Sequence, residues 1–328
     1  MASRTALAFL FCLGSWSLNA QDTTVPVHPK MIFAADTQAP MWVETVVLKA
    51  DHNREATKML FHDIGTQNPE HVFLLGDVVN LGYSSHQWKP MDKYLQSLRD
   101  KNIKVDAVLG NHEVMGECKK GEKKFEKRFA DHRRTGYMEV SDSVAVVLLN
   151  SNFTKLTREE NEQQVKWYKK TLQELDADPS IVYIITGCHH SPFTDSKIVS
   201  PSKGVQENFV PFFMNSTKSR LFLSGHCHGF EHYQVKGKDF LVIGGGGGIH
   251  QPLNKTNSEN PDLASDYKPM FHYITVQRAG DHLEVTSRAL QSDFTAFNNG
   301  MTIEIGKPAV VPTGLASSHA VPAKDGQQ

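Results

Sequence analysis

The sequence predicts an α/β fold in which helices cover a parallel or mixed β-sheet. Short apolar runs alternate with amphipathic stretches as far as about residue 220, at the spacing of strand–helix–strand units. Beyond residue 230 the segments are strand-like and are separated by turns. These two observations predict one domain whose first part alternates strands with helices and whose last part consists of strands.

The elements follow from hydrophobic periodicity. Short, continuous apolar runs predict buried strands at 31–35, 71–75, 105–109, 144–149, 181–185 and 220–224. Apolar residues at helical spacing predict helices at about 44–65, 86–101 and 158–175. Further strands are expected at 230–235, 239–243, 271–276 and 282–287.

The composition is that of an ordinary folded protein. The 328 residues include 35 basic and 36 acidic side chains, which gives a net charge of −1. This balance offers no electrostatic case for a nucleic acid or an anionic membrane surface as partner. Four cysteines are too few for a disulfide-based scaffold. No later stretch is long and apolar enough for a membrane span.

Residues 1–20 are expected to be a signal peptide. Arg4 is followed by the apolar run 6–14, and Ala20 offers a small residue at a cleavage point. The run is shorter than the roughly 20 residues that cross a bilayer, and the alternative is a buried N-terminal helix. We therefore expect a secreted or periplasmic protein with one folded domain over 30–290 and a flexible tail over 306–328.

Three cysteines remain after such a cleavage, Cys118, Cys188 and Cys227. This odd number allows one internal disulfide or none. Sequons for N-glycans begin at Asn152, Asn215 and Asn254.

Polar groups follow five of the expected strands directly. The strand ends carry Asp36-Thr-Gln38, Gly76-Asp77, Gly110-Asn111-His112-Glu113, His189-His190-Ser-Pro192 and Gly225-His226-Cys-His228. Ligand sites of α/β proteins form at the carboxyl ends of strands. Carboxylates with imidazoles are typical ligands of Zn, Mn and Fe. About seven candidate ligands exceed the need of one tetrahedral ion and favour two ions that share a carboxylate, an arrangement used in phosphoryl transfer.

This ordered series of motifs resembles the calcineurin-like metallophosphoesterase superfamily, which includes purple acid phosphatases and many phosphodiesterases. The match runs from Asp36 to His228. The resemblance implies a four-layer αββα sandwich with two mixed β-sheets and a dinuclear centre of Mn, Fe or Zn between them. It also implies hydrolysis of a small phosphorylated substrate, either a phosphomonoester or a phosphodiester, by a metal-activated hydroxide.

Roles are carried over by motif position. Asp77 would bridge both ions; Asp36, Gln38 and His228 would complete one ion, and Asn111, His190 and His226 the other. His190 rather than its neighbour His189 is expected to be the ligand, because the family's histidine stands two residues before the proline. His112 is expected to act on the transferring phosphoryl group or the leaving oxygen.

Two positions depart from the family pattern. Gln38 is a neutral amide where histidine is common, and Asn80 stands where purple acid phosphatases carry a tyrosine ligand. The first departure leaves open an alternative, a catalytically weak or idle metal-binding member of the fold that acts as an exported recognition protein. The glycine run 244–248 does not open a helix, so a close backbone approach to the site is favoured over nucleotide binding.

Overall fold

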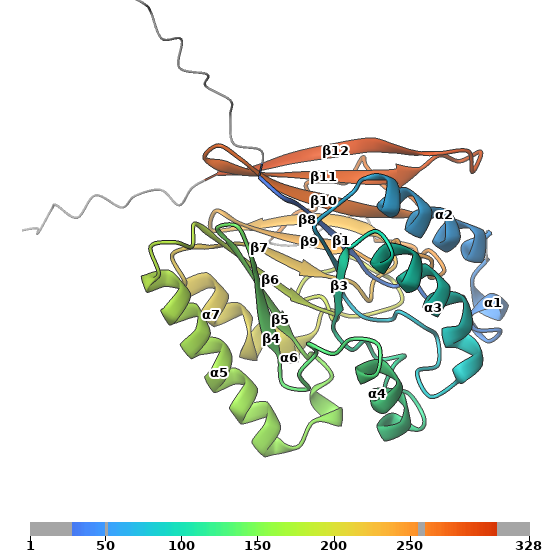
Figure 1. Cartoon of the computed structure of the whole chain (residues 1–328), viewed down its shortest axis with the longest axis horizontal. Helices are drawn as coiled ribbons and strands as arrows, with labels where there is room; N and C mark the ends of the chain where they lie inside the picture. Colours follow the sequence, from blue (N-terminus) through green and yellow to red (C-terminus); the bar gives the residue numbers. More distant parts are fainter. Residues whose placement is uncertain (1–27, 50–51, 255–259, 307–328) are drawn as a thin grey trace, which may run out of the picture.

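The computed structural model describes residues 28–49, 52–254 and 260–306, and their strands form two six-stranded sheets (Figure 1). The first sheet has the order β12-β11-β10-β1-β2-β3, with β1 (Lys30–Ala34), β2 (His71–Leu74), β3 (Lys104–Ala107), β10 (His272–Ala279), β11 (His282–Leu290) and β12 (Phe297–Gly306). The second has the order β4-β5-β6-β7-β9-β8, with β4 (Tyr137–Ser141), β5 (Val144–Leu149), β6 (Tyr183–Cys188), β7 (Ser219–Ser224), β8 (Phe230–Val235) and β9 (Lys238–Ile243).

Both sheets are mixed, as the sequence predicts. In the first sheet β1, β2 and β3 are parallel, while β10, β11 and β12 are antiparallel to their neighbours. In the second sheet β5, β6, β7 and β9 are parallel and the edge strands β4 and β8 are antiparallel. The carboxyl ends of the parallel strands therefore meet along one edge of each sheet, where the polar motifs lie.

The helices cover the outer faces of the two sheets (Figure 1). They are α1 (Glu44–Val47), α2 (Asn53–Thr66), α3 (Ser85–Arg99), α4 (Cys118–Glu126), α5 (Arg158–Ala177), α6 (Lys203–Asn208) and α7 (Val210–Asn215), with one 3₁₀ turn at Phe153–Lys155. Helices α2 and α3 lie against the first sheet, and α5 and α7 lie against the second. The result is the predicted αββα sandwich.

Side-chain alternation along the strands builds three apolar layers. In β5, Val146 and Leu148 point into the core between the sheets, whereas Val147 and Leu149 point to the layer under α5 and α7. Strand β1 divides in the same way, with Phe33 between the sheets and its neighbours under α2 and α3. Two-sided burial explains why these strands are apolar throughout.

Two expected boundaries differ from the structure. The helix expected over 44–65 is divided, because α1 ends at Val47 and Leu48 is extended; β-branched residues at 45–47 favour this break. The first sheet also continues past residue 290, since β12 pairs with β11 and places Ile305 in the core. The expected signal peptide, and the expected tail after residue 306, lie outside the described residues.

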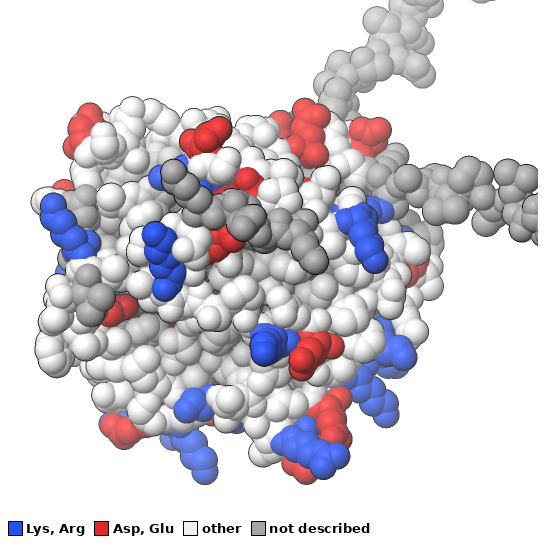
Figure 2. All heavy atoms as spheres, turned by 180° about the vertical axis from the view of Figure 1, so that it is seen from behind, with Lys and Arg blue, Asp and Glu red and all other residues white. Residues whose placement is uncertain are grey.

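Within the described ranges, no helix combines the length and apolarity needed to cross a membrane. The three cysteines of this part of the chain are free thiols, and Cys188 and Cys227 are buried. Asn152 is also buried and its amide donates to the carbonyl of Leu109, whereas Asn215 and Asn254 are exposed. Basic and acidic side chains are interspersed on the face seen from behind (Figure 2).

Candidate metal centre

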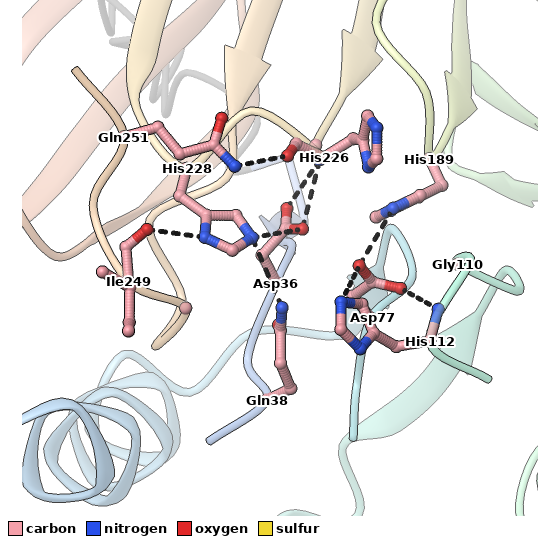
Figure 3. A network of polar contacts seen from close by, with 12 residues as sticks. Asp36, Gln38, Asp77, Gly110, His112, His189, His226, His228, Ile249 and Gln251 are labelled. Atoms are coloured by element: carbon pink, nitrogen blue, oxygen red, sulfur yellow. Dashed lines mark hydrogen bonds and ion pairs between the residues drawn. The ribbon is translucent and has the colours of Figure 1, made fainter. Parts of the chain in front are cut away.

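The polar residues that follow β1, β2, β3, β6 and β7 converge on one region between the sheets (Figure 3). Their side chains group around two carboxylates, Asp77 and Asp36, both of which are fully buried. Two sets of potential metal ligands have their donor atoms within 4.8 Å of one another: Asp36, Asp77 and His189 form one set, and His189, His190 and His226 form the other. Segments far apart in the sequence thus meet at one cluster.

Asp77 lies at the centre of this cluster. Its Oδ1 atom accepts the backbone N–H of His112 at 2.8 Å. Its Oδ2 atom lies 3.2 Å from Nε2 of His189 and 3.7 Å from Nε2 of His112. One carboxylate is therefore approached from the ends of β3 and β6 at once.

The two adjacent histidines after β6 have different surroundings. His189 is fully buried; its Nδ1 contacts the Leu75 carbonyl at 2.9 Å, and its Nε2 lies 3.0 Å from Oδ1 of Asn111. His190 contacts Ser151 Oγ through both its backbone N–H, at 2.9 Å, and its Nδ1, at 2.8 Å. The ring of His190 also lies 4.5 Å from the ring of His226. It is His189 that faces Asp77 and Asn111.

Asp36 forms the second centre of contacts. Its carboxylate accepts the backbone N–H of His226, at 2.9 Å to Oδ2, and lies 3.4 Å from Nε2 of His228. Nδ1 of His228 lies 2.7 Å from the Ile249 carbonyl. Because a carbonyl only accepts, His228 donates through Nδ1 and turns Nε2 toward Asp36.

The Gln38 side chain joins this group. Its amide nitrogen is best satisfied by donating to the backbone carbonyls of Asp77, at 2.8 Å, and Asp36, at 3.1 Å. The amide oxygen then takes the position 3.3 Å from Nε2 of His228. The Gln38 amide oxygen and His228 Nε2 can each donate a lone pair to a metal ion. Two ligands of one ion with bonds near 2.1 Å lie about 3 Å apart, so the separation of these two atoms suits a shared ion.

The backbone at the candidate ligands is strained. Asp36, Asp77 and His226 have φ values of 59°, 50° and 68°, in the left-handed region. Such conformations cost about 1–3 kcal/mol each and persist only where the surroundings impose them. Gly110 and Gly225 make the geometry possible, because a Cβ at either position would overlap the Asp77 or the Asp36 carboxylate.

A buried glutamate holds the loops in place. The Glu113 carboxylate accepts three backbone N–H groups, from Asp77 at 2.8 Å, Val79 at 3.0 Å and Gly110 at 2.9 Å. Burial, together with the charge of Asp77, raises the pKa of Glu113 to about 7 despite these hydrogen bonds. Glu113 is thus a positioning residue that fixes the ends of β2 and β3 relative to each other.

The cluster also shifts the pKa of its own members. Burial alone would raise the pKa of Asp77, but the imidazoles of His189 and His112 outweigh it and hold that pKa well below its usual value. Burial opposes protonation of His189, yet the Asp77 carboxylate raises its pKa to about 9. Burial and the neighbouring His189 lower the pKa of His190 to about 3. In the absence of metal, a proton on His189 offsets part of the buried negative charge.

The residues present suit metal ions. His189 and His228 each use Nδ1 on a backbone carbonyl, which leaves Nε2 directed at a carboxylate, as in many metal-binding histidines. Asp, Asn and His donors together match Zn, Mn and Fe. All eight residues singled out from the sequence lie at this site, namely Asp36, Gln38, Asp77, Asn111, His112, His190, His226 and His228.

Fold and donor set together define a metallophosphoesterase-type protein. The chain belongs to the calcineurin-like phosphoesterase family, whose sequence profile matches residues 29–230. No curated protein sequence matches the chain.

Solved structures share the fold at low sequence identity. A purple acid phosphatase from yellow lupin (Lupinus luteus) seeds has a TM-score of 0.67 at 14% identity, and the match covers 86% of this chain and 54% of that one. A dimetal phosphatase from Danio rerio has a TM-score of 0.57 at 13% identity, over 86% and 99% of the chains. GAP50, described as the anchor in the inner membrane complex of Plasmodium, has a TM-score of 0.65 at 12% identity, over 86% and 90%. The chain thus spans about half the length of the lupin enzyme.

Several groups at this site were not predicted from the sequence motifs to have a role. They are the Glu113 carboxylate and the carbonyls of Leu75, Asn80 and Ile249 that orient His189, His112 and His228. An acidic residue directly after Asn111-His112 was the one available signal for Glu113. The glycine run does approach the site, since Gly248 donates its N–H to the Asp36 carbonyl at 2.8 Å.

Proposed function

We propose that the chain hydrolyses phosphate esters at a centre of two metal ions. Asp77 would be shared by both ions, because a carboxylate offers two oxygens. One ion would be held by Asp36, Gln38 and His228, and the other by Asn111, His189 and His226. The observation that carries the proposal is the approach of His189 and His112 to the Asp77 carboxylate, at 3.2 and 3.7 Å.

Two bound ions would supply Lewis acidity and lower the pKa of a water nucleophile. The chain's own contribution would be to position the reacting groups. His112 is oriented by its Nδ1, which donates to the Asn80 carbonyl at 2.9 Å, and its Nε2 faces the cluster. We assign His112 as the residue that contacts the phosphoryl group or donates a proton to the leaving oxygen.

The test is turnover of an activated aryl phosphate by the metal-loaded protein. His112→Ala is expected to lower kcat by about 10²–10⁴-fold, the usual contribution of a general acid, while the metal content stays that of the wild type. His62→Ala, which removes an exposed imidazole on α2, is the matched control and should leave kcat unchanged. Unchanged turnover in His112→Ala with metal bound would overturn the assignment.

A second candidate function is metal-dependent recognition without turnover. It is supported by Gln38, a neutral amide at a candidate ligand position, and by the description of the Plasmodium structure as an anchor. Full metal loading without turnover of any mono- or diester tested would favour it. Action outside the cytosol is part of either proposal, and amino-terminal sequencing of the exported chain, expected to begin near Gln21, tests it.

A further inference from the structure

A cavity of about 270 Å³ lies between α2 and α3, beside the loops that carry the candidate ligands. Thr37, which separates Asp36 from Gln38, forms part of its wall, and so do Val78, Val79 and Asn80 directly after Asp77. We call this cavity the α2–α3 pocket. It is not used by the proposed metal centre itself.

The α2–α3 pocket has an apolar floor and a basic rim. Val79 and Met91 are each 3% exposed, and the half-buried Tyr94 completes the floor. Arg54 and Lys89 are exposed at the rim, and neither forms an ion pair with a described residue. No described residue that lines the pocket is acidic. The pocket therefore suits an apolar body that carries negative charge at its outer end.

Asn80 is a second, independent sign of a ligand. The residue lines the pocket and is only 4% exposed, and its buried Oδ1 atom has no hydrogen-bond partner among the described residues. A buried acceptor without a partner is costly, and a donor bound in the pocket would relieve that cost if the Asn80 amide turned toward it.

The pocket also lies next to His112. The Asn80 carbonyl accepts from His112 Nδ1 at 2.9 Å, so one residue both contacts the imidazole through its backbone and lines the pocket. Asn80 thus links the α2–α3 pocket to the imidazole that we assign to the leaving oxygen.

We propose that the α2–α3 pocket binds the leaving group of the substrate, and that the preferred substrates are phosphate esters of a ring-sized apolar alcohol bearing a second anionic group. The apolar floor would accept the ring, and Arg54 with Lys89 would pair with the second anion. This inference rests on the proposed function, since it names the substrate class of the same site.

The test measures kcat/KM for two substrates, 4-carboxyphenyl phosphate and phenyl phosphate. For each ester the value of the variant is divided by that of the wild type, so that the different intrinsic reactivities of the two esters cancel. The double variant Arg54→Glu/Lys89→Glu is expected to lower kcat/KM by roughly tenfold for the carboxylated ester and by less than about twofold for phenyl phosphate. The matched control is Lys58→Glu with Lys93→Glu, exposed lysines of α2 and α3 that do not line the pocket. Equal losses on both esters, or the same selective loss in the control, would overturn the proposal.

The floor of the pocket is tested separately. Gln87, half-buried in the pocket wall, is replaced by Trp to fill the space. KM for both aryl esters should rise, whereas the inhibition constant of inorganic phosphate, which leaves the pocket empty, should not change. An unchanged KM in a variant of wild-type Tm would contradict the proposal.

A binding measurement separates this inference from the proposed function. The probe is 4-carboxyphenylphosphonate, which cannot be hydrolysed, titrated into the metal-loaded protein by calorimetry. Binding that the double variant weakens by roughly tenfold supports the pocket even if no ester is turned over, in which case only the proposed function fails. Binding that the double variant does not change overturns the pocket.

Discussion

The Nε2 atom of His189 lies 3.2 Å from Oδ2 of Asp77, which joins the end of β6 in one sheet to the end of β2 in the other. The Leu75 carbonyl, two residues before Asp77, accepts from the opposite side of the same ring at 2.9 Å. The ring is therefore clamped between the backbone that precedes Asp77 and the Asp77 carboxylate. His190 lacks both contacts and instead meets Ser151.

This contrast predicts different effects of two neighbouring substitutions. His189→Ala should lower metal affinity by at least about 10–100-fold, because it removes a proposed ligand together with the contact that orients Asp77. His190→Ala should leave metal content unchanged, since its ring meets Ser151 and His226 and neither of the two carboxylates. Metal titration of the two apo proteins measures the difference. The reverse result would make His190 the ligand, as the motif spacing suggests.

The close approach of Gly225 to Asp36 yields a second prediction. Gly225→Ala should displace the Asp36 carboxylate, weaken metal binding and destabilise the protein by about 1–3 kcal/mol, a usual cost of overpacking. Gly229→Ala is the control, because a Cβ there meets its nearest neighbours only at 3.8 Å. Urea unfolding and metal titration of both variants test the claim, and equal behaviour of the two would refute it.

A third prediction concerns stability at acid pH and a histidine remote from the metal centre. His132 is 6% exposed and packs against the rings of Phe125 and Tyr137. Burial lowers its pKa from 6.5 to about 4. Between these values the unfolded chain binds a proton that the folded protein does not, so the free energy of unfolding falls as the pH falls.

His132→Phe removes this titration and keeps an aromatic ring in place. As the pH falls from 7.5 to 4.5, the free energy of unfolding of the variant should rise by roughly 2–3 kcal/mol relative to that of the wild type. This is about two pKa units at 1.36 kcal/mol each. Urea unfolding with a chelator present keeps metal binding out of the comparison. If the difference in the free energy of unfolding between variant and wild type stays constant over this pH range, the pKa of His132 is the same in the folded and the unfolded chain and the prediction is wrong.

Much of the site could be predicted from the sequence because each motif directly follows a strand. Parallel pairing of β1 with β2 and of β2 with β3 then brings separate motifs to one edge, whatever the intervening loops. His189 and His190 could not be distinguished in this way. Both follow the same strand, and only tertiary contacts with Leu75 and Ser151 give their rings different surroundings.

The parts of the fold that sequence reasoning missed have local causes. The interruption after Val47 begins with an extended residue, Leu48, which hydrophobic periodicity does not register. Strand β12 fully buries only Phe297 and Ile305, which lie at its two ends, so its apolar pattern is weaker than that of the central strands. An edge strand pairs on one side only, and its sequence is correspondingly less constrained.

The central claim is that Asp77 organises a centre of two metal ions, and the metal content per chain of the purified protein tests it most directly. Plasma mass spectrometry should find about two equivalents in the wild type, and Asp77→Ala should lose them, because a shared carboxylate serves both ions. One equivalent or none in the wild type, even after incubation with Mn, Zn and Fe, would contradict a dinuclear centre and favour the recognition role.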